Sequence, residues 1–178
     1  NYQGIRFAPD SGWVARENVI EFCWIHDVGQ DGINNPVDSA TQGFDSYTVR
    51  NCLIEGTGDD GLEVGPSWTV YNSIIRDTRR VRGHPDGIQS VGNYQRYYNN
   101  IISDFSSSYI VTQGRGSDYS NIQIYGNLLV VHKLPASSTL VELKWLPIES
   151  NTAERSTWHD WAFVNNTIVG AANGSQIG

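Results

Sequence analysis

The sequence predicts an all-β solenoid of about six coils, and two repeated phrases carry this prediction. The first phrase is Asp-Gly, then an aliphatic residue, then polar and aliphatic residues in alternation. It begins at Asp31, Asp60 and Asp86, so successive starts are 29 and 26 residues apart. Asp-Gly is turn chemistry, because Gly tolerates positive φ and the Asp side chain bonds its own backbone. A turn and an alternating strand recurring at this period indicate stacked coils.

The second phrase sets a Cys, Ser or Asn between two apolar positions, and six copies of it align without a gap. Two apolar columns are what a solenoid core needs, since each coil buries its inward side chains only against neighbouring coils. We therefore expect both columns to be interior. The first column is Ile20, Val49, Val70, Tyr97, Ile124 and Phe163, and the second is Ile25, Ile54, Ile75, Ile102, Leu129 and Ile168.

The coils are expected in chain order after one short strand at 4–7. The first four are expected at 18–44, 45–66, 68–93 and 94–115, and the fifth begins at 121. The step from Asn127 to Asn166 is 39 residues, which predicts an excursion within 133–160. Residues 140–143 are a candidate for the second strand of that coil. The whole chain, 1–178, is expected to be one domain.

These phrases resemble the right-handed parallel β-helix family, which includes pectate lyases, polygalacturonases and phage tailspikes. The resemblance covers about 18–170, and the turns at 99–100, 127 and 165–166 look like the asparagine ladder of that fold. It implies a right-handed parallel β-helix. The alternative is an antiparallel sandwich with hairpins about every 8–12 residues, but the longer period and the register of the six copies argue against it.

Composition limits the partners. A net charge of −7 disfavours nucleic acid and anionic membranes. No apolar run approaches the length that spans a bilayer. The sequence contains no Met and shows no signal peptide, so we expect a processed, secreted form or a piece of a longer chain.

The two cysteines, Cys23 and Cys52, occupy one position in consecutive coils. Neighbouring strands lie about 4.8 Å apart, which is within the usual Cα–Cα range of a disulfide. The Cβ atoms of strictly stacked residues would lie slightly too far apart. The pattern therefore predicts either a disulfide or a buried pair of thiols and favours neither.

The Asp-Gly turns would stack Asp31, Asp60 and Asp86 in one column. Like charges this close raise one another's pKa or require a cation. The column is therefore expected to hold protons or to bind calcium, which takes oxygen ligands. The alternative is that each Asp caps its own turn and points into water. Four further residues are expected beside the column: Asp59, Glu63, His84 and Gln89.

A closer resemblance lies in the residues at 58–65, which are similar to the doubled-aspartate motif of polygalacturonase-type hydrolases. Residues 31–32 look like the Asp-Gly element that precedes this motif, and 83–88 is similar to the Gly-His-Gly element with Pro85-Asp86 inserted. Gly61 stands where that family usually has a cysteine. The resemblance implies an inverting site in which Asp60 is the general acid, Asp31 and Asp59 activate water, and His84 positions these groups.

A lyase would use the same surface differently. In β-elimination from a uronic acid, Asp31, Asp60 and Asp86 would bind calcium, and Arg79, Arg80 or Arg82 would be the base or clamp the substrate's charge. The alternative for these arginines is a solvated loop. Tryptophans are candidate platforms for sugar rings, since an aromatic face packs on the C–H side of a sugar. Trp24, Trp68 and Trp145 are the candidates, although Trp68 fits turn packing equally well.

Two functions follow from these observations. The first is a secreted carbohydrate-active hydrolase or lyase that acts on acidic polysaccharide. Its expected catalytic residues are Asp31, Asp59, Asp60, His84 and Asp86, and its expected substrate contacts are Glu63, Arg79, Arg82, Gln89 and Trp145. The second is a non-catalytic structural or adhesive solenoid, such as a tailspike or extracellular fibre segment, that assembles end to end or as a homo-oligomer.

Overall fold

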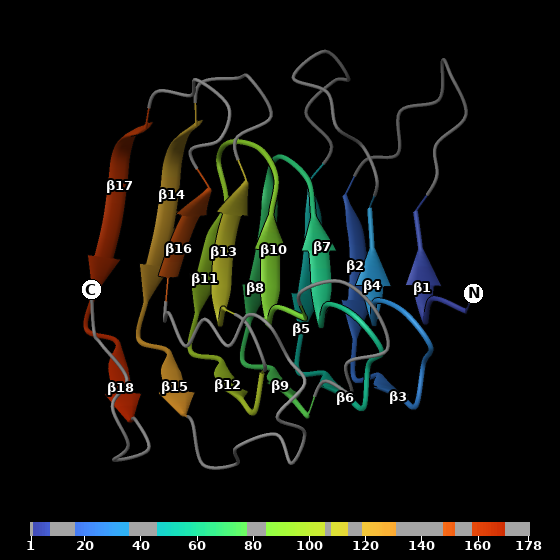
Figure 1. Cartoon of the computed structure of the whole chain (residues 1–178). Helices are drawn as coiled ribbons and strands as arrows, with labels where there is room; N and C mark the ends of the chain where they lie inside the picture. Colours follow the sequence, from blue (N-terminus) through green and yellow to red (C-terminus); the bar gives the residue numbers. More distant parts are fainter. Residues whose placement is uncertain are drawn as a thin grey trace.

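A computed structural model of the chain is a right-handed parallel β-helix (Figure 1). The structure describes residues 2–7, 17–35, 46–77, 85–105, 108–113, 119–130, 148–151 and 158–169. Three parallel sheets, A, B and C, run along the solenoid and each contains six strands. Among the described residues no helix is long and apolar enough to cross a bilayer.

Each coil contributes one strand to each sheet, and every strand pairs with its equivalents in the neighbouring coils. Sheet A contains β1 (Ile5–Arg6), β4 (Ile33–Asn34), β7 (Leu62–Val64), β10 (Ile88–Ser90), β13 (Ile110–Gln113) and β16 (Ile148–Asn151). Sheet B contains β2 (Asn18–Glu21), β5 (Tyr47–Arg50), β8 (Trp68–Tyr71), β11 (Arg96–Tyr98), β14 (Tyr119–Tyr125) and β17 (Trp158–Val164). Sheet C contains β3 (Trp24–His26), β6 (Leu53–Glu55), β9 (Ile74–Arg76), β12 (Ile101–Ser103), β15 (Leu128–Val130) and β18 (Thr167–Val169).

Both predicted apolar columns are confirmed in register. In sheet B the first column pairs residue by residue from Ile20 to Phe163. In sheet C the second column does so from Ile25 to Ile168. The first five members of each column are buried, while Phe163 is 45% exposed and Ile168 is also exposed. The exposed pair lies in β17 and β18, the outermost strands of their sheets, where no described strand packs on them.

The turn between sheets B and C carries the predicted asparagine ladder, which consists of Asn100, Asn127 and Asn166. Each Oδ1 accepts a bond from the main-chain N–H one coil earlier, at 2.9 to 3.0 Å. Each Nδ2 donates to a main-chain carbonyl, also one coil earlier, at 2.8 to 2.9 Å. The residue before each ladder position is left-handed, as at Asn99 with φ of 54°. The asparagines therefore satisfy backbone groups that the turn leaves unpaired.

The glycines of the Asp-Gly phrase have a different role from the one expected. Gly32, Gly61 and Gly87 are not among the positive-φ residues. A Cβ on Gly61 would lie 2.5 Å from the carbonyl oxygen of Gly87 and 2.5 Å from a methyl group of Ile75. Glycine is required here because the backbones of neighbouring coils approach closely, and the expectation of positive φ was wrong.

Two further expectations concern the excursion and the cysteines. In sheet A the strand that follows β13 is β16, which pairs with it. The candidate strand at 140–143 lies outside the described residues. The two cysteines are free thiols. Cys52 is buried and donates toward the carbonyl oxygen of Arg50 at 3.2 Å, while Cys23 donates toward that of Glu21 at 3.3 Å.

Candidate functional site

The candidate site begins with the aspartate column, which consists of Asp31, Asp60 and Asp86. Each residue lies two positions before a strand of sheet A, at β4, β7 and β10. The paired strands hold the turns in register, because Ile33, Leu62 and Ile88 are direct partners. All three aspartates are buried, so the alternative that they point into water is wrong.

Hydrogen bonds to the main chain hold the column together. Oδ1 of Asp31 accepts from the N–H of Asp60 at 3.2 Å, and Oδ1 of Asp60 accepts from the N–H of Asp86 at 2.8 Å. Oδ1 of Asp86 accepts from the N–H of Ser108 at 2.7 Å, which places Ser108 next in the column. Each carboxyl group therefore uses one oxygen to bind the following coil.

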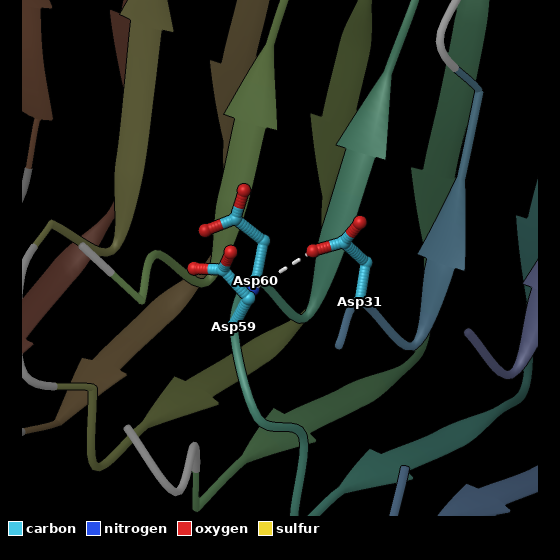
Figure 2. Close-up of side chains that lie close together, drawn as sticks. All are labelled: Asp31, Asp59 and Asp60. Atoms are coloured by element: carbon cyan, nitrogen blue, oxygen red, sulfur yellow. Dashed lines mark hydrogen bonds between the residues drawn. The ribbon is translucent and has the colours of Figure 1, made fainter. Parts of the chain in front are cut away.

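Asp59 brings a third carboxyl group to Asp31 and Asp60. The three offer carboxylate oxygens that all lie within 4.8 Å of one another. Asp59 and Asp60 come from one turn before β7, and Asp31 comes from the adjoining coil (Figure 2). Asp59 is half-buried, whereas only 3% of Asp60 is exposed. This acidic cluster (Asp31, Asp59 and Asp60) is the group that solvent reaches through Asp59. The sequence predicted Asp31, Asp60 and Asp86 as calcium ligands, whereas the three carboxyl groups that lie within 4.8 Å are those of Asp31, Asp60 and Asp59.

Burial and crowding shift the acid–base properties of the cluster. Burial raises the pKa of Asp60 well above its usual value, and the negative charges of Asp86, Asp59 and Asp31 raise it further. Burial also raises the pKa of Asp31, although hydrogen bonds from Asn34, the Asp60 N–H and Gln3 oppose this. Asp60 is therefore more disposed than Asp31 to keep a proton near neutral pH.

Asn34 is a member of the site that sequence reasoning missed. Its Nδ2 donates to Oδ2 of Asp31 at 2.6 Å and to Oε2 of Glu63 at 2.5 Å. Only 4% of Asn34 is exposed, and its Oδ1 has no hydrogen-bond partner among the described residues. Asn34 shares one column of sheet A with Glu63 and Gln89, a register that was available from the Asp-Gly repeat.

The remaining predicted site residues divide into three groups. Glu63 and Gln89 are direct partners in sheet A, and Gln89 is buried. Trp68 is fully buried and stacks on Tyr47 at 4.7 Å between ring centroids, so its role as a sugar platform was wrong. Four residues lie outside the part of the chain that the structure describes: His84, Arg79, Arg82 and Trp145.

The chain matches no protein-family model, no curated protein and no solved structure.

Proposed function

We propose that this β-helix is a carbohydrate-active enzyme of the pectate lyase and polygalacturonase type that hydrolyses an acidic polysaccharide at sheet A. One observation carries the proposal: three carboxyl groups converge within 4.8 Å, and Asp60 among them is almost fully buried. Burying carboxylates together is unfavourable unless protons or cations offset their charge. A protonated carboxyl group beside an ionised one is the combination that glycoside hydrolysis needs.

The cluster suggests a role for each member. Oδ1 of Asp60 accepts the N–H of Asp86, so the proton belongs on Oδ2, from which it would pass to the leaving glycosidic oxygen. The oxygens are closer than the roughly 6.5–9.5 Å typical of carboxyl pairs that hold a water between them. Carboxyl groups this close match the spacing of about 5–5.5 Å in retaining enzymes, where the second carboxylate is the nucleophile. Half-exposed Asp59 would then attack the anomeric carbon while Asp60 protonates the leaving oxygen, and water would hydrolyse the resulting ester with Asp60 as its base. Burial and the charge of Asp86, with smaller contributions from Asp59 and Asp31, would keep Asp60 protonated.

A second candidate is β-elimination with calcium, and the three carboxylate oxygens within 4.8 Å of one another favour it. Calcium takes about 6–8 oxygen ligands, and Asp31, Asp59 and Asp60 would supply some of them. Calcium held there would neutralise the cluster and steady the carboxylate of a uronic acid. The base for this reaction would come from the arginines of 79–82, which lie outside the described residues.

The experiment is a cleavage assay on polygalacturonate and related acidic glycans. Reducing-sugar release detects a hydrolase, and the ultraviolet absorbance of an unsaturated uronate detects a lyase. Asp60→Asn keeps the shape and the bond to the Asp86 N–H but removes the proton, so hydrolysis should fall by at least about 100-fold, the size typical of a lost general acid. Asp160→Asn, which changes the charge equally on an exposed left-handed residue, should retain activity.

The outcomes separate the candidates. Activity that needs calcium and yields unsaturated product would support elimination instead of hydrolysis. If the wild-type chain gives neither signal on a broad panel of acidic glycans, both candidates are overturned and the structural solenoid remains.

A further inference from the structure

Sheet C carries an exposed tryptophan that the proposed function does not use. Trp24 lies in β3 and is 63% exposed. Its column continues through Leu53, Ile74 and Ile101 on the outer side of sheet C. Sheet C forms a different side of the solenoid from sheet A, so this surface is separate from the acidic cluster (Figure 1).

Neighbouring side chains fix the indole ring in place. One face of the ring stacks on His26, with 4.1 Å between centroids and 25° between planes. Nε1 donates to Oε1 of Glu55 at 2.8 Å, and the other oxygen of Glu55 accepts from Nε and pairs with Nη2 of Arg76, both at 2.8 Å. An exposed ring ordered in this way loses little conformational freedom when a ligand binds to it.

The charged groups around the ring carry no excess of positive charge. Arg76 pairs with Glu55, and Nδ1 of His26 lies 3.0 Å from a carboxylate oxygen of Asp27. The described residues beside Trp24 therefore do not attract an anionic chain. A ligand that suits this surface has an apolar face for the ring, hydroxyl groups for its edge and no net charge.

We infer that Trp24, with Glu55 and Arg76, is a binding platform for a neutral polysaccharide, separate from the cleavage site. A pyranose ring presents a C–H face that packs on an aromatic ring and hydroxyl groups that bond to its polar neighbours. Another coil or subunit added at the edge of sheet C would pair with the backbone of β3 and leave the outward-facing indole uncovered. The platform would hold the enzyme on a glycan matrix while sheet A acts on a different, acidic chain.

Affinity electrophoresis tests this inference without any cleavage. The wild-type chain is run in native gels that contain galactan, xylan or a soluble β-glucan, with polygalacturonate as the charged comparison. At least one neutral glycan should retard the wild type, and Trp24→Ala should weaken that binding by about tenfold, the size expected for one lost aromatic contact. Glu55→Ala frees the indole and should weaken binding, while Glu55→Gln keeps an acceptor for Nε1 and should preserve most of it.

Phe22→Ala is the matched control, because Phe22 is 78% exposed on the turn just before β3 and has no part in the bonded set around Trp24. It should bind neutral glycan like the wild type. Thermal melts should be equal for both variants, since both side chains are exposed. The inference is overturned if no neutral glycan retards the wild type, or if Trp24→Ala and wild type are retarded equally. It is also overturned if Trp24→Ala changes only the oligomeric state, which would assign the surface to a second copy of the chain. Cleavage of acidic glycans is scored separately, so either proposal can fail without the other.

Discussion

Two corners of each coil solve the same backbone problem with different chemistry. The asparagine ladder and the aspartate column both place a side-chain oxygen on the main-chain N–H of a neighbouring coil. The asparagines also donate through Nδ2, so their bonds to the backbone are complete and no charge is buried. The aspartates have no such donor and are buried beside one another. Asparagine makes the same bond to a main-chain N–H without a charge, so the aspartates differ from the ladder in their carboxyl groups and not in this bond.

The largest expected effect comes from placing a charge in the neutral ladder. In Asn100→Asp, the new carboxylate would face the carbonyl oxygen of Val70 and Oδ1 of Asn127, both of which now accept from Nδ2. An uncompensated buried charge of this kind should lower the free energy of unfolding by about 3–5 kcal/mol. Urea denaturation measures it. Asn99→Asp, one residue earlier and exposed, should change the value by less than about 0.5 kcal/mol.

The close approach of coils at the aspartate column predicts the next effect. Gly61→Ala would place a methyl group 2.5 Å from the Gly87 carbonyl oxygen, and the stack must shift to admit it. Overpacking of this kind should cost about 1–3 kcal/mol. Gly29→Ala is the control, because the nearest atoms to its added Cβ lie 4.0 Å away. Equal melting temperatures for the two variants would contradict the proposed reason for the Asp-Gly phrase.

Calcium would distinguish the two corners further, because only the acidic cluster offers it anionic oxygens. At about 100 times its dissociation constant, calcium should stabilise the fold by about 2.7 kcal/mol. Differential scanning calorimetry with calcium and then with chelator measures the shift. Asp59→Asn should reduce the shift, since it removes one carboxylate from the cluster and keeps the three main-chain bonds of the aspartate column. If calcium leaves the melting temperature unchanged, the cluster does not bind calcium, and the interpretation that it holds a proton remains.

The smallest effect concerns pH. The folded-state pKa of Asp60 lies above its unfolded value, so the folded state holds that proton more tightly. Its contribution to stability is complete below the unfolded pKa and is lost as pH rises through the folded pKa. Asp60→Asn should therefore be more stable than the wild type at neutral pH and should show a flatter dependence from pH 4 upward, measured by denaturant titration at several pH values. An unchanged slope would show that Asp60 is ionised throughout.

The columns of the core could be predicted because each coil repeats one apolar spacing, and strand register turns that spacing into contacts. The stacking of Asp31, Asp60 and Asp86 followed from the same register. Other features depend on contacts between coils that no single phrase contains. The close approach at Gly61 is one, and the bridge from Asn34 to Glu63 is another. Trp68 lies two residues before the interior Val70 in β8, so the alternation of the strand already predicted an inward side chain, and the ring packs there with Phe7 and Tyr47.

The two corners also bond in opposite directions along the stack. In the aspartate column the earlier coil supplies the acceptor and the later coil the N–H. In the asparagine ladder the later coil supplies the acceptor. The hydrogen bonds of a middle coil are therefore complete only when both neighbouring coils are folded, because each neighbour supplies an acceptor for one of its main-chain N–H groups. Such reciprocal dependence should make unfolding of the stack more all-or-none than the pairwise additivity usual for repeat proteins.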